Sequence, residues 1–467
     1  MNKKIKDLWY IFSANFLNFL MGIVTGFLVP KFLGIDDYAY VKVFTFYITY
    51  VGISHFGLID GIYIKYGSFE YDELPREKLR GYTKVLFVMQ IIESIILSLA
   101  MVILVGNQNR IIIFLFTFFN MIIMNMTTLW TYINQITKRF KIFSINTILS
   151  KVLYLIGLVI LILLNSFGYI TYMVLQTLIN IVIMCIYMYN DRELIFGKSI
   201  KFKEAIKDCI SLVKVGFFVL IGNFMSLLIL GIDRLFIDRL FSLKDFAIYS
   251  FAYTLISLFF ILLNSVTTVI YPYLTRAKKE SFKEVYETIR MSITLIMSIT
   301  LCGYFVIKVI VIQFLPQYSE SFDILMYLVP TVIYSGQINI LISNYYKVLN
   351  KTKEYTVNNI VALLLAFGTN LIAYVIFKDM KAIAVSTLIS FILWVLYSDL
   401  YFKKILHVKV FRTYILEAFV LVLFILCAEF LGWFTGAAVY LIGLIIFIVI
   451  FSRNDIKNII KIITKKE

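Results

Sequence analysis

The sequence predicts an all-α protein that crosses a membrane about fourteen times, in two six-helix lobes followed by a C-terminal pair of helices. Three observations lead to this prediction. The 467 residues are 61% hydrophobic and 15% charged, and the mean hydropathy of +0.90 is too high for a soluble protein of this length. Apolar runs of about 20 residues, the length that crosses a bilayer as a helix, follow one another along the chain. The third observation is an internal repeat.

The repeat appears when the sequence is shifted by 208 positions against itself. The register then holds without a gap over about fifty residues. It aligns Asn15-Phe16 with Asn223-Phe224, Lys31 with Arg239, Asp37-Tyr38-Ala39 with Asp245-Phe246-Ala247, and Ile62-Tyr63 with Ile270-Tyr271. Two similar lobes that rock around a site between them are typical of transporters.

The apolar runs predict the individual spans. They cover residues 8–29, 39–62, 84–105, 111–133, 143–164, 168–189, 214–237, 246–271, 288–312, 323–346, 355–377, 382–402, 413–431 and 434–451. The last two runs are short and are joined by Gly432-Trp433-Phe434. The first run follows three lysines, as a signal peptide would, but it ends in Val-Pro-Lys without a small-residue cleavage site, which favours a retained helix.

Basic residues predict the orientation of the chain. If the N-terminus is cytoplasmic, the inner segments carry 34 Lys and Arg residues and the outer loops carry 7. Because cytoplasmic loops of membrane proteins are enriched in Lys and Arg, this asymmetry places both termini in the cytoplasm. It also explains the net charge of +16 without a nucleic-acid partner.

The repeat and the loops predict four parts. Residues 1–189 form an N-terminal lobe, 190–213 an amphipathic cytoplasmic linker on the membrane surface, 214–402 a C-terminal lobe, and 403–467 two accessory helices with a basic tail. The outer loops are too short for an extracytoplasmic domain, and the inner loops are too short for an ATP-binding domain.

Several kinds of site are disfavoured by the sequence. Gly197-Lys198-Ser199 resembles the end of a P-loop, but Arg192 stands where the motif requires Gly. The two histidines, His55 and His407, are too distant for a convincing zinc site. The four cysteines are scattered and predict no disulfide framework. We therefore expect no metal, no cofactor and no enzymatic activity.

Ionisable residues inside the spans are the first candidates for function. A charge at mid-bilayer costs about 2.5–3.5 kcal/mol on insertion scales, so it normally faces a partner or a wet cavity. Glu93 lies near the middle of the third span and Lys151 in the inner half of the fifth. Asp233 and Arg234 lie one turn inside the outer end of the seventh span, and they point about 100° apart on a helix.

Three of the in-span charges have an alternative, purely structural interpretation. Lys42 can extend to the outer interface, Arg234 can pair with Asp238 four residues later, and Asp60 lies close enough to the cytoplasm to be solvated. Glu93 and Lys151 are harder to explain in this way, and we interpret them as lining a central cavity.

Amides also recur inside the spans. Most are expected to join helices, because amide hydrogen bonds hold helices together in lipid. Asn15 and Asn223 occupy equivalent repeat positions and can instead line the cleft symmetrically. The full set is Asn15, Asn18, Asn120, Asn223, Asn264, Gln337, Asn339 and Asn344.

Three motifs resemble a known family. The segments PKFLGIDDY (30–38), DRLFI (233–237) and YPYL (271–274) resemble the polysaccharide flippases of the multidrug/oligosaccharidyl-lipid/polysaccharide exporter superfamily. The resemblance covers about residues 8–400, and its motifs are more specific for the superfamily than for a substrate. It implies a MATE-like, V-shaped pair of lobes around a cationic cavity.

The resemblance also implies a function. The expected substrate is an undecaprenyl-pyrophosphate-linked oligosaccharide, flipped across the bacterial inner membrane for O-antigen or capsule synthesis, with membrane lipids, a polymerase and other assembly proteins as candidate partners. Several relatives place a cation at position 26, which is Gly here, so the diphosphate contacts shift to Lys151, Lys42 and Arg234. Ion coupling would use Glu93 or Asp233.

Two alternatives remain open. A drug or organic-cation antiporter of the same superfamily should have an acidic cavity, whereas the spans carry at least as many cations as anions. A membrane polymerase, ligase or glycosyltransferase of the same pathway usually needs a long outer loop or a cluster of carboxylates, and the sequence offers neither.

Overall fold

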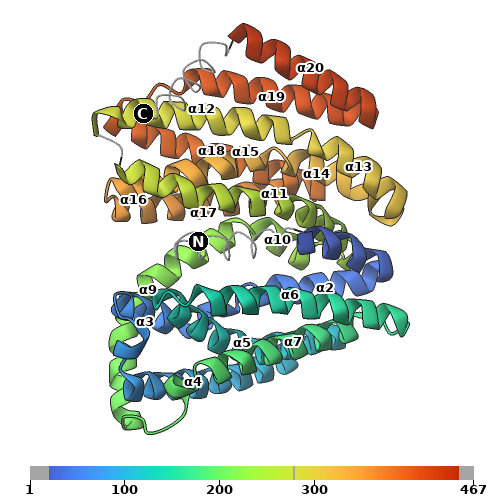
Figure 1. Ribbon diagram of the computed structural model, residues 1–467. Helices are drawn as coiled ribbons and strands as arrows, with labels where there is room; N and C mark the ends of the chain where they lie inside the picture. Colours follow the sequence, from blue (N-terminus) through green and yellow to red (C-terminus); the bar gives the residue numbers. More distant parts are fainter. Residues whose placement is uncertain (1–19, 277–278, 452–467) are drawn as a thin grey trace. The chain divides into compact units, whose positions relative to one another are not determined.

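The computed structural model describes residues 20–276 and 279–451, and these residues form helices and connecting turns without a strand (Figure 1). The predicted all-α class is therefore confirmed. Over the described residues, eleven helices are long and apolar enough to cross a membrane, or up to thirteen if each of two bent pairs is one span. The described part of the first predicted span, Leu20–Phe32, is a shorter apolar helix.

The chain divides into two compact units between Leu227 and Leu228. In the first unit, α4 packs on α5, and α7 packs on both α5 and α6. Its elements after the helix Leu20–Phe32 are α2 (Ile35–Ile48), η1 (Val51–His55), α3 (Leu58–Tyr66), η2 (Tyr71–Glu73), α4 (Arg76–Leu104), α5 (Gln108–Ile136), α6 (Phe140–Leu163), α7 (Tyr169–Asn190), α8 (Arg192–Ile195) and most of α9 (Phe202–Ile229).

The second unit has more interrupted helices. Its accessory helices α19 and α20 pack on each other, and they contact α12 and α13 respectively. The elements are α10 (Ile232–Leu240), α11 (Leu243–Arg276), η3 (Lys279–Ser281), α12 (Phe282–Thr300), α13 (Gly303–Phe314), η4 (Pro316–Ser321), α14 (Phe322–Leu328), α15 (Thr331–Gly336), the π-helix η5 (Gln337–Ile342), α16 (Ser343–Val348), α17 (Thr352–Phe377), α18 (Met380–Leu406), α19 (Phe411–Phe430) and α20 (Trp433–Phe451).

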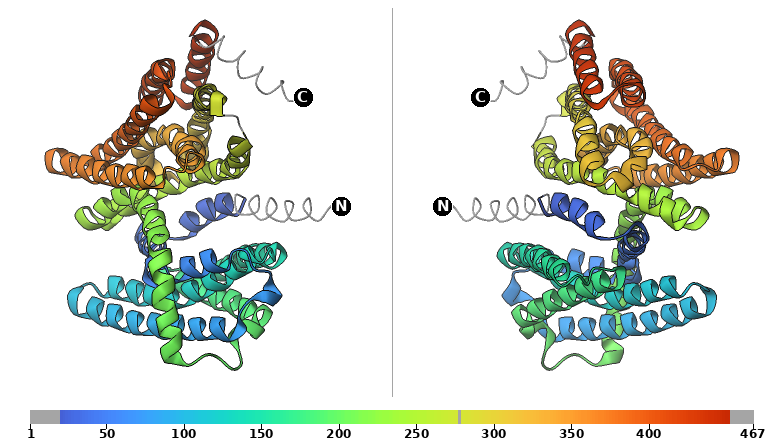
Figure 2. Two further views of the ribbon diagram at one scale, coloured as in Figure 1. Left: turned by 90° about the vertical axis from the view of Figure 1, so that its left-hand side faces the viewer. Right: turned by 90° about the vertical axis from the view of Figure 1, so that its right-hand side faces the viewer.

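The seventh predicted span differs from the structure at both ends. Helix α9 begins at Phe202, inside the predicted linker, and ends at Ile229, so the remainder of the span forms the separate helix α10. The early start has a packing reason. A stripe of small and apolar side chains spaced for one helix face is buried along α9: Ala205, Cys209 and Leu212. As Figure 2 shows, α9 runs across the other helices of unit 1.

Glycines allow this close crossing. A side chain at Gly81 of α4 would meet Ala205, and one at Gly61 of α3 would meet the backbone of Leu212. Small residues at helix contacts let backbones approach closely in membrane proteins. The second half of the predicted linker is therefore a packed part of unit 1.

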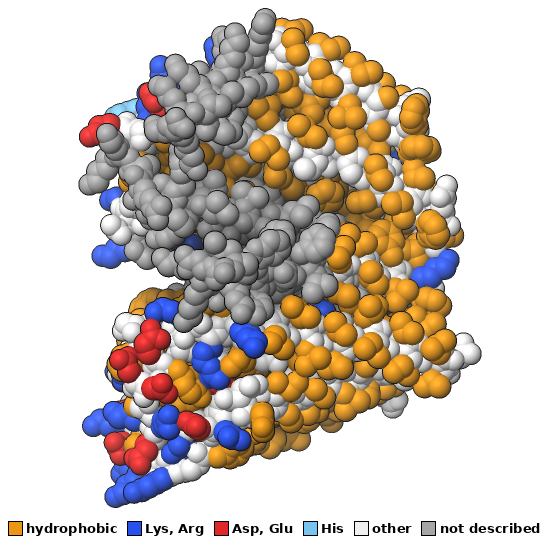
Figure 3. All heavy atoms as spheres, viewed as in Figure 1, with side chains coloured by type: hydrophobic (Ala, Val, Ile, Leu, Met, Phe, Trp, Pro, Cys, Tyr) orange, Lys and Arg blue, Asp and Glu red, His pale blue; other side chains and the backbone are white. Residues whose placement is uncertain are grey.

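The outward surface of the units has the composition of a membrane protein. Large hydrophobic side chains cover it, as on α4, where Ile103 is 80% exposed, and on α20, where Ile450 is 65% exposed. Figure 3 shows this hydrophobic cover, and it shows charged side chains gathered at the end of unit 1 where α3 ends and α4 begins. Charged loops beside apolar helix surfaces fit a bilayer as the surrounding solvent.

Candidate functional site

The second predicted span is unwound near its middle. Helix α2 ends at Ile48, η1 follows, and α3 begins at Leu58, with an angle of 61° between the two parts. Phe56 and Gly57 are left-handed, with φ values of 48° and 86°. Glycine is favoured at the second position for two reasons: the positive φ, and the backbone of Phe217 on α9, which a Cβ would meet.

The repeat-related helix of unit 2 is continuous. Helix α11 begins at Leu243, which the 208-residue shift aligns with the start of α2 at Ile35, and it runs unbroken to Arg276. The position equivalent to Gly57 is Ser265. The break is therefore present in unit 1 and not in the equivalent helix of unit 2, although α2 and α11 start at positions that the 208-residue shift aligns.

Two amides satisfy backbone carbonyls of the unwound segment. Asn125 Nδ2 on α5 donates to the Val51 carbonyl at 3.1 Å, and Gln90 Nε2 on α4 donates to the Ser54 carbonyl at 3.0 Å. Asn125 Nδ2 also donates to Gln90 Oε1 at 2.7 Å. Backbone that departs from the α-helix at membrane depth is tolerated only where protein or water satisfies its polar groups, so these amides stabilise the break.

Glu93 joins this polar segment. It lies one turn after Gln90 on α4, and its Oε2 accepts a 3.1 Å hydrogen bond from Gln90 Nε2. Glu93 is half-buried. Lys151, which the sequence predicted to line the same cavity, is not an electrostatic partner of Glu93 among the described residues. A carboxylate, two amides and an unwound backbone thus lie together inside one unit.

A buried histidine and a carboxylate lie at the start of α3. His55 Nδ1 accepts a 3.1 Å hydrogen bond from the Gly57 N–H, so in a neutral ring the proton lies on Nε2. That nitrogen is 3.8 Å from Asp60 Oδ2. Asp60 is only 5% exposed, which corrects the interpretation that it is solvated near the cytoplasm. Asp60 is buried because the face of α3 that carries it packs against other helices of unit 1.

In unit 2, Asp233 and Arg234 on α10 contact α11. Asp233 is 2% exposed, and its Oδ2 accepts a 2.8 Å hydrogen bond from the hydroxyl of Tyr249. The Arg234 guanidinium lies 3.6 Å from the ring centroid of Tyr253. The two side chains therefore contact tyrosines one turn apart on the same helix.

The remaining predicted site residues are dispersed. Lys42 is half-buried on α2, with Nζ 5.1 Å from the ring centroid of Tyr38. Lys151 is exposed on α6 and Asn223 is exposed on α9. Asn15 lies outside the described residues, as does Asn18. The roles proposed for these side chains stay predictions.

The amide Asn120 does what most in-span amides were expected to do. Its Nδ2 on α5 donates to Thr177 Oγ1 on α7 at 2.8 Å, and its Oδ1 accepts from Asn180 Nδ2, also on α7, at 2.8 Å. The interpretation that such amides join helices is confirmed for this residue.

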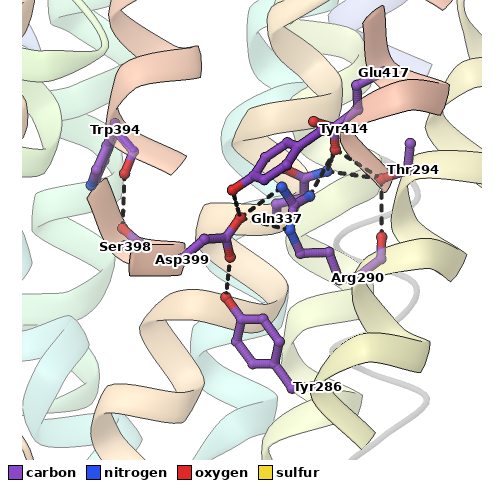
Figure 4. A network of polar contacts seen from close by, with 9 residues as sticks. All are labelled: Tyr286, Arg290, Thr294, Gln337, Trp394, Ser398, Asp399, Tyr414 and Glu417. Carbon is purple, nitrogen blue, oxygen red and sulfur yellow. Dashed lines mark hydrogen bonds and ion pairs between the residues drawn. The ribbon is translucent and has the colours of Figure 1, made fainter. Parts of the chain in front are cut away.

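A fully buried arginine in unit 2 was not among the predicted site residues. Arg290 on α12 is 0% exposed and lies between two carboxylates (Figure 4). Its Nη2 is 2.7 Å from Asp399 Oδ2 on α18, and its Nη1 is 2.7 Å from Glu417 Oε1 on α19. Each residue lies within two turns of a predicted cytoplasmic helix end, which made it resemble a loop charge. The only indication of the cluster in the sequence is that Arg290, Asp399 and Glu417 all lie near the predicted cytoplasmic ends of their spans.

Comparisons with known proteins agree with this architecture. A family model described as polysaccharide biosynthesis protein matches residues 5–278. No curated protein shows significant sequence similarity to the chain. Among solved structures, the lipid II flippase MurJ in an inward closed conformation is similar with a TM-score of 0.70 at 14% identity, covering 97% of this chain and 100% of that one.

Two multidrug transporter structures share the fold as well. A point mutant of the Vibrio cholerae MATE transporter VcmN has a TM-score of 0.58 at 12% identity over 86% of this chain and 96% of that one. An inward-facing MATE family transporter of the MOP superfamily has a TM-score of 0.58 at 12% identity, covering 84% and 95%. At these identities the similarity concerns the fold.

Proposed function

Since the chain belongs to the polysaccharide biosynthesis protein family, within the multidrug/oligosaccharidyl-lipid/polysaccharide exporter superfamily, we propose that it flips undecaprenyl-pyrophosphate-linked oligosaccharides. The direction is from the cytoplasmic to the outer leaflet of the bacterial inner membrane, for surface polysaccharide synthesis. Both termini are then cytoplasmic. The family match and the fold shared with a lipid II flippase support this proposal.

The environment of Lys151 is the observation that supports an anionic, lipid-linked substrate. It is exposed on a helix that is long and apolar enough to span the membrane, and no described carboxylate is its electrostatic partner. A cation inside a span normally faces a partner or a wet cavity. A lipid-linked diphosphate supplies the missing negative charge, and its sugar head cannot cross hydrocarbon unaided.

The other candidate residues complete the mechanism. Lys42 and Arg234 are further cations for the diphosphate, and Asn15 and Asn223 are candidate amides for the sugars. Binding the diphosphate by charge-assisted hydrogen bonds leaves the polyprenyl tail in lipid. Alternating access of the site to the two sides then moves the head group, with Glu93 or Asp233 binding the coupling ion.

Reconstitution tests the function directly. Purified protein in vesicles should move a fluorescent polyprenyl-diphosphate-linked oligosaccharide between leaflets, and a polyprenyl-linked sugar without the diphosphate should be a poor substrate. Transport of organic cations with no lipid flipping would instead support the drug antiporter alternative, which the fold shared with MATE transporters favours. Empty vesicles and vesicles with Lys151→Ala protein serve as controls.

A further inference from the structure

The Arg290 cluster of unit 2 has an unequal number of charges. Arg290, Asp399 and Glu417 are 0%, 2% and 3% exposed, and they lie on the three spans that include α12, α18 and α19. The guanidinium has Glu417, Asp399, Tyr286 and Tyr414 as its electrostatic partners. One cation therefore faces two carboxylates. With both ionised, the cluster would hold a net negative charge in a buried part of a membrane protein, where an uncompensated charge is strongly disfavoured.

Hydrogen bonds distinguish the two carboxylates. Asp399 accepts on both oxygens, from Tyr286 at Oδ1 and from Arg290 Nε and Tyr414 at Oδ2, at 2.6, 2.9 and 2.6 Å. This is the environment of an ionised carboxylate, because every contact is a donor. For Glu417, the hydrogen bonds from Arg290, Thr294 and Gln337 are all made to Oε1. A proton on Oε2 of Glu417 would displace none of these donors.

We propose that this cluster is a proton-binding site and that Glu417 carries the proton. The site then holds a neutral carboxylic acid, an ionised Asp399 and the Arg290 guanidinium, and its charges balance. The site is separate from Glu93 and Asp233, and it does not depend on the proposed transport activity.

Gln337 gives a second, independent observation. Its side chain is 0% exposed, and its Nε2 donates to Thr294 Oγ1 at 2.8 Å and to Glu417 Oε1 (Figure 4). Its Oε1 is buried without a hydrogen-bond partner in the described structure. The oxygen and nitrogen of an amide have nearly the same shape. In the orientation seen, the amide donates to Oε1 while the proton is on Oε2, and after a half-turn it would accept from a proton on Oε1. A buried amide able to serve either state of its neighbour is what a proton site requires.

The backbone at Gln337 is also unusual. It begins the π-helix η5, Gln337–Ile342, and short π-helical segments occur frequently at functional sites. The segment lies within a continuous helical stretch, between α15 and α16. This places Gln337 between α12 and α19, which both contribute to the cluster.

A proton fits this cluster better than a metal ion. The groups around the Arg290 guanidinium are Glu417, Asp399, Tyr286 and Tyr414, and Tyr334 on α15 lies near Glu417 and Arg290. Both oxygens of Asp399 and Oε1 of Glu417 accept from N–H and O–H donors, which a sodium ion would have to displace to obtain the several oxygen ligands that hard cations need.

The proton has a structural consequence for the accessory helices. Glu417 is on α19, whereas its partners Arg290, Thr294 and Gln337 belong to the core of unit 2. Protonation weakens the ionic attraction between Glu417 and Arg290 but removes the repulsion between Glu417 and Asp399. The state of this one carboxyl group therefore adjusts how α19 is held against α12 and α18.

The test compares Glu417→Gln with wild-type full-length protein in nanodiscs. Unfolding of the wild type releases a proton, because an exposed glutamate is ionised at neutral pH. The melting temperature of the wild type should therefore fall as pH rises from mildly acidic to mildly alkaline values. The corresponding unfolding constant should increase by up to about tenfold per pH unit. Glu417→Gln should be folded and should have a shallower slope, because one proton fewer is released on unfolding.

Glu429→Gln is the matched control. Glu429 is exposed at the other end of the same helix, and this variant should keep the wild-type slope. A wild-type slope in Glu417→Gln would overturn the proposal. So would stabilisation of the wild type, but not of Glu417→Gln, by sodium over potassium at fixed pH, since this would make the occupant a metal ion.

Infrared spectroscopy keeps the proposal testable if Glu417→Gln does not fold. The wild type should show the carbonyl stretch of a buried carboxylic acid at mildly acidic pH, and this band should weaken at alkaline pH. Conservative Glu417→Asp protein should shift the band. The assignment would be refuted if the wild type showed no band of a protonated carboxyl group, or if Glu417→Asp left that band unchanged.

Discussion

The side-chain amide of Gln90 donates one hydrogen bond to Glu93 Oε2 at 3.1 Å and another to the Ser54 carbonyl at 3.0 Å. A single residue thus connects the in-span carboxylate of α4 to the unwound backbone between α2 and α3. In transporters, coupling ions are often bound where helices are discontinuous. The position of Glu93 beside such a break strengthens its candidacy as the coupling residue.

Glu93→Gln tests this coupling. The variant mimics the protonated carboxyl group, so it should still bind lipid-linked substrate but should lose its sensitivity to a proton uncoupler in reconstituted vesicles. Transport at the wild-type rate with unchanged uncoupler sensitivity would exclude Glu93, and Asp233 would be tested next. Glu77→Gln, at the exposed start of the same helix, is the control and should behave as wild type.

Gln90→Leu should destabilise unit 1. The variant removes the hydrogen bonds from Gln90 to the Ser54 carbonyl and from Asn125 to Gln90. A buried polar group left unsatisfied costs about 1–3 kcal/mol. We expect a lower melting temperature in detergent. Gln135→Leu, near the end of α5, is the control, and an equal loss of stability in both variants would contradict the role of Gln90.

Gly57→Ala should be more damaging than Gly52→Ala. Gly57 has a φ of 86° and its Cβ would meet the backbone of Phe217, whereas a Cβ at Gly52, in the same unwound segment, meets nothing within 4 Å. Strained left-handed backbone costs on the order of 1–3 kcal/mol. Yield of folded protein and melting temperature measure the difference. Similar values for the two variants would show that the close contact between α3 and α9 is dispensable.

Lys151→Ala should reduce export of the lipid-linked glycan by about tenfold or more, since a hydrogen bond to a charged group contributes about 1.5–3 kcal/mol. Lys151→Arg should retain more activity, because charge is the proposed requirement. Surface glycan is measured in cells that lack their own flippase, at matched membrane abundance. Lys141→Ala, at the start of the same helix, is the control. Normal glycan with Lys151→Ala would show that this cation is structural.

The orientation can be tested by cysteine labelling. Asn107→Cys lies in a predicted outer loop and Ser199→Cys in a predicted inner loop, so an impermeant reagent should label only the first in intact cells. The native Cys185 is exposed, so all four cysteines are first replaced. Labelling of Ser199→Cys with protection of Asn107→Cys would reverse the topology.

Features that depend on local composition could be predicted from the amino-acid sequence. Each apolar run after the first is helical in the structure, as one helix or as consecutive helical segments, because the transfer of about 20 residues into lipid is a sum over neighbours in the chain. The repeat register also held, since α2 and α11 begin at the aligned positions Ile35 and Leu243. Glu93, Asp233 and Arg234 could be selected because a charge is conspicuous within an apolar run.

Which charges contact one another depends instead on how the helices pack. Arg290 is more than a hundred residues from Asp399 and Glu417 in the sequence, and those two lie on different spans. The 2.7 Å contacts of Arg290 with both exist because α12, α18 and α19 pack together. The break after Ile48 depends on amides from α4 and α5 and on the approach of α9. The burial of Asp60 has the same origin. Hydropathy describes how a segment meets its solvent, whereas these features arise from how distant segments meet one another.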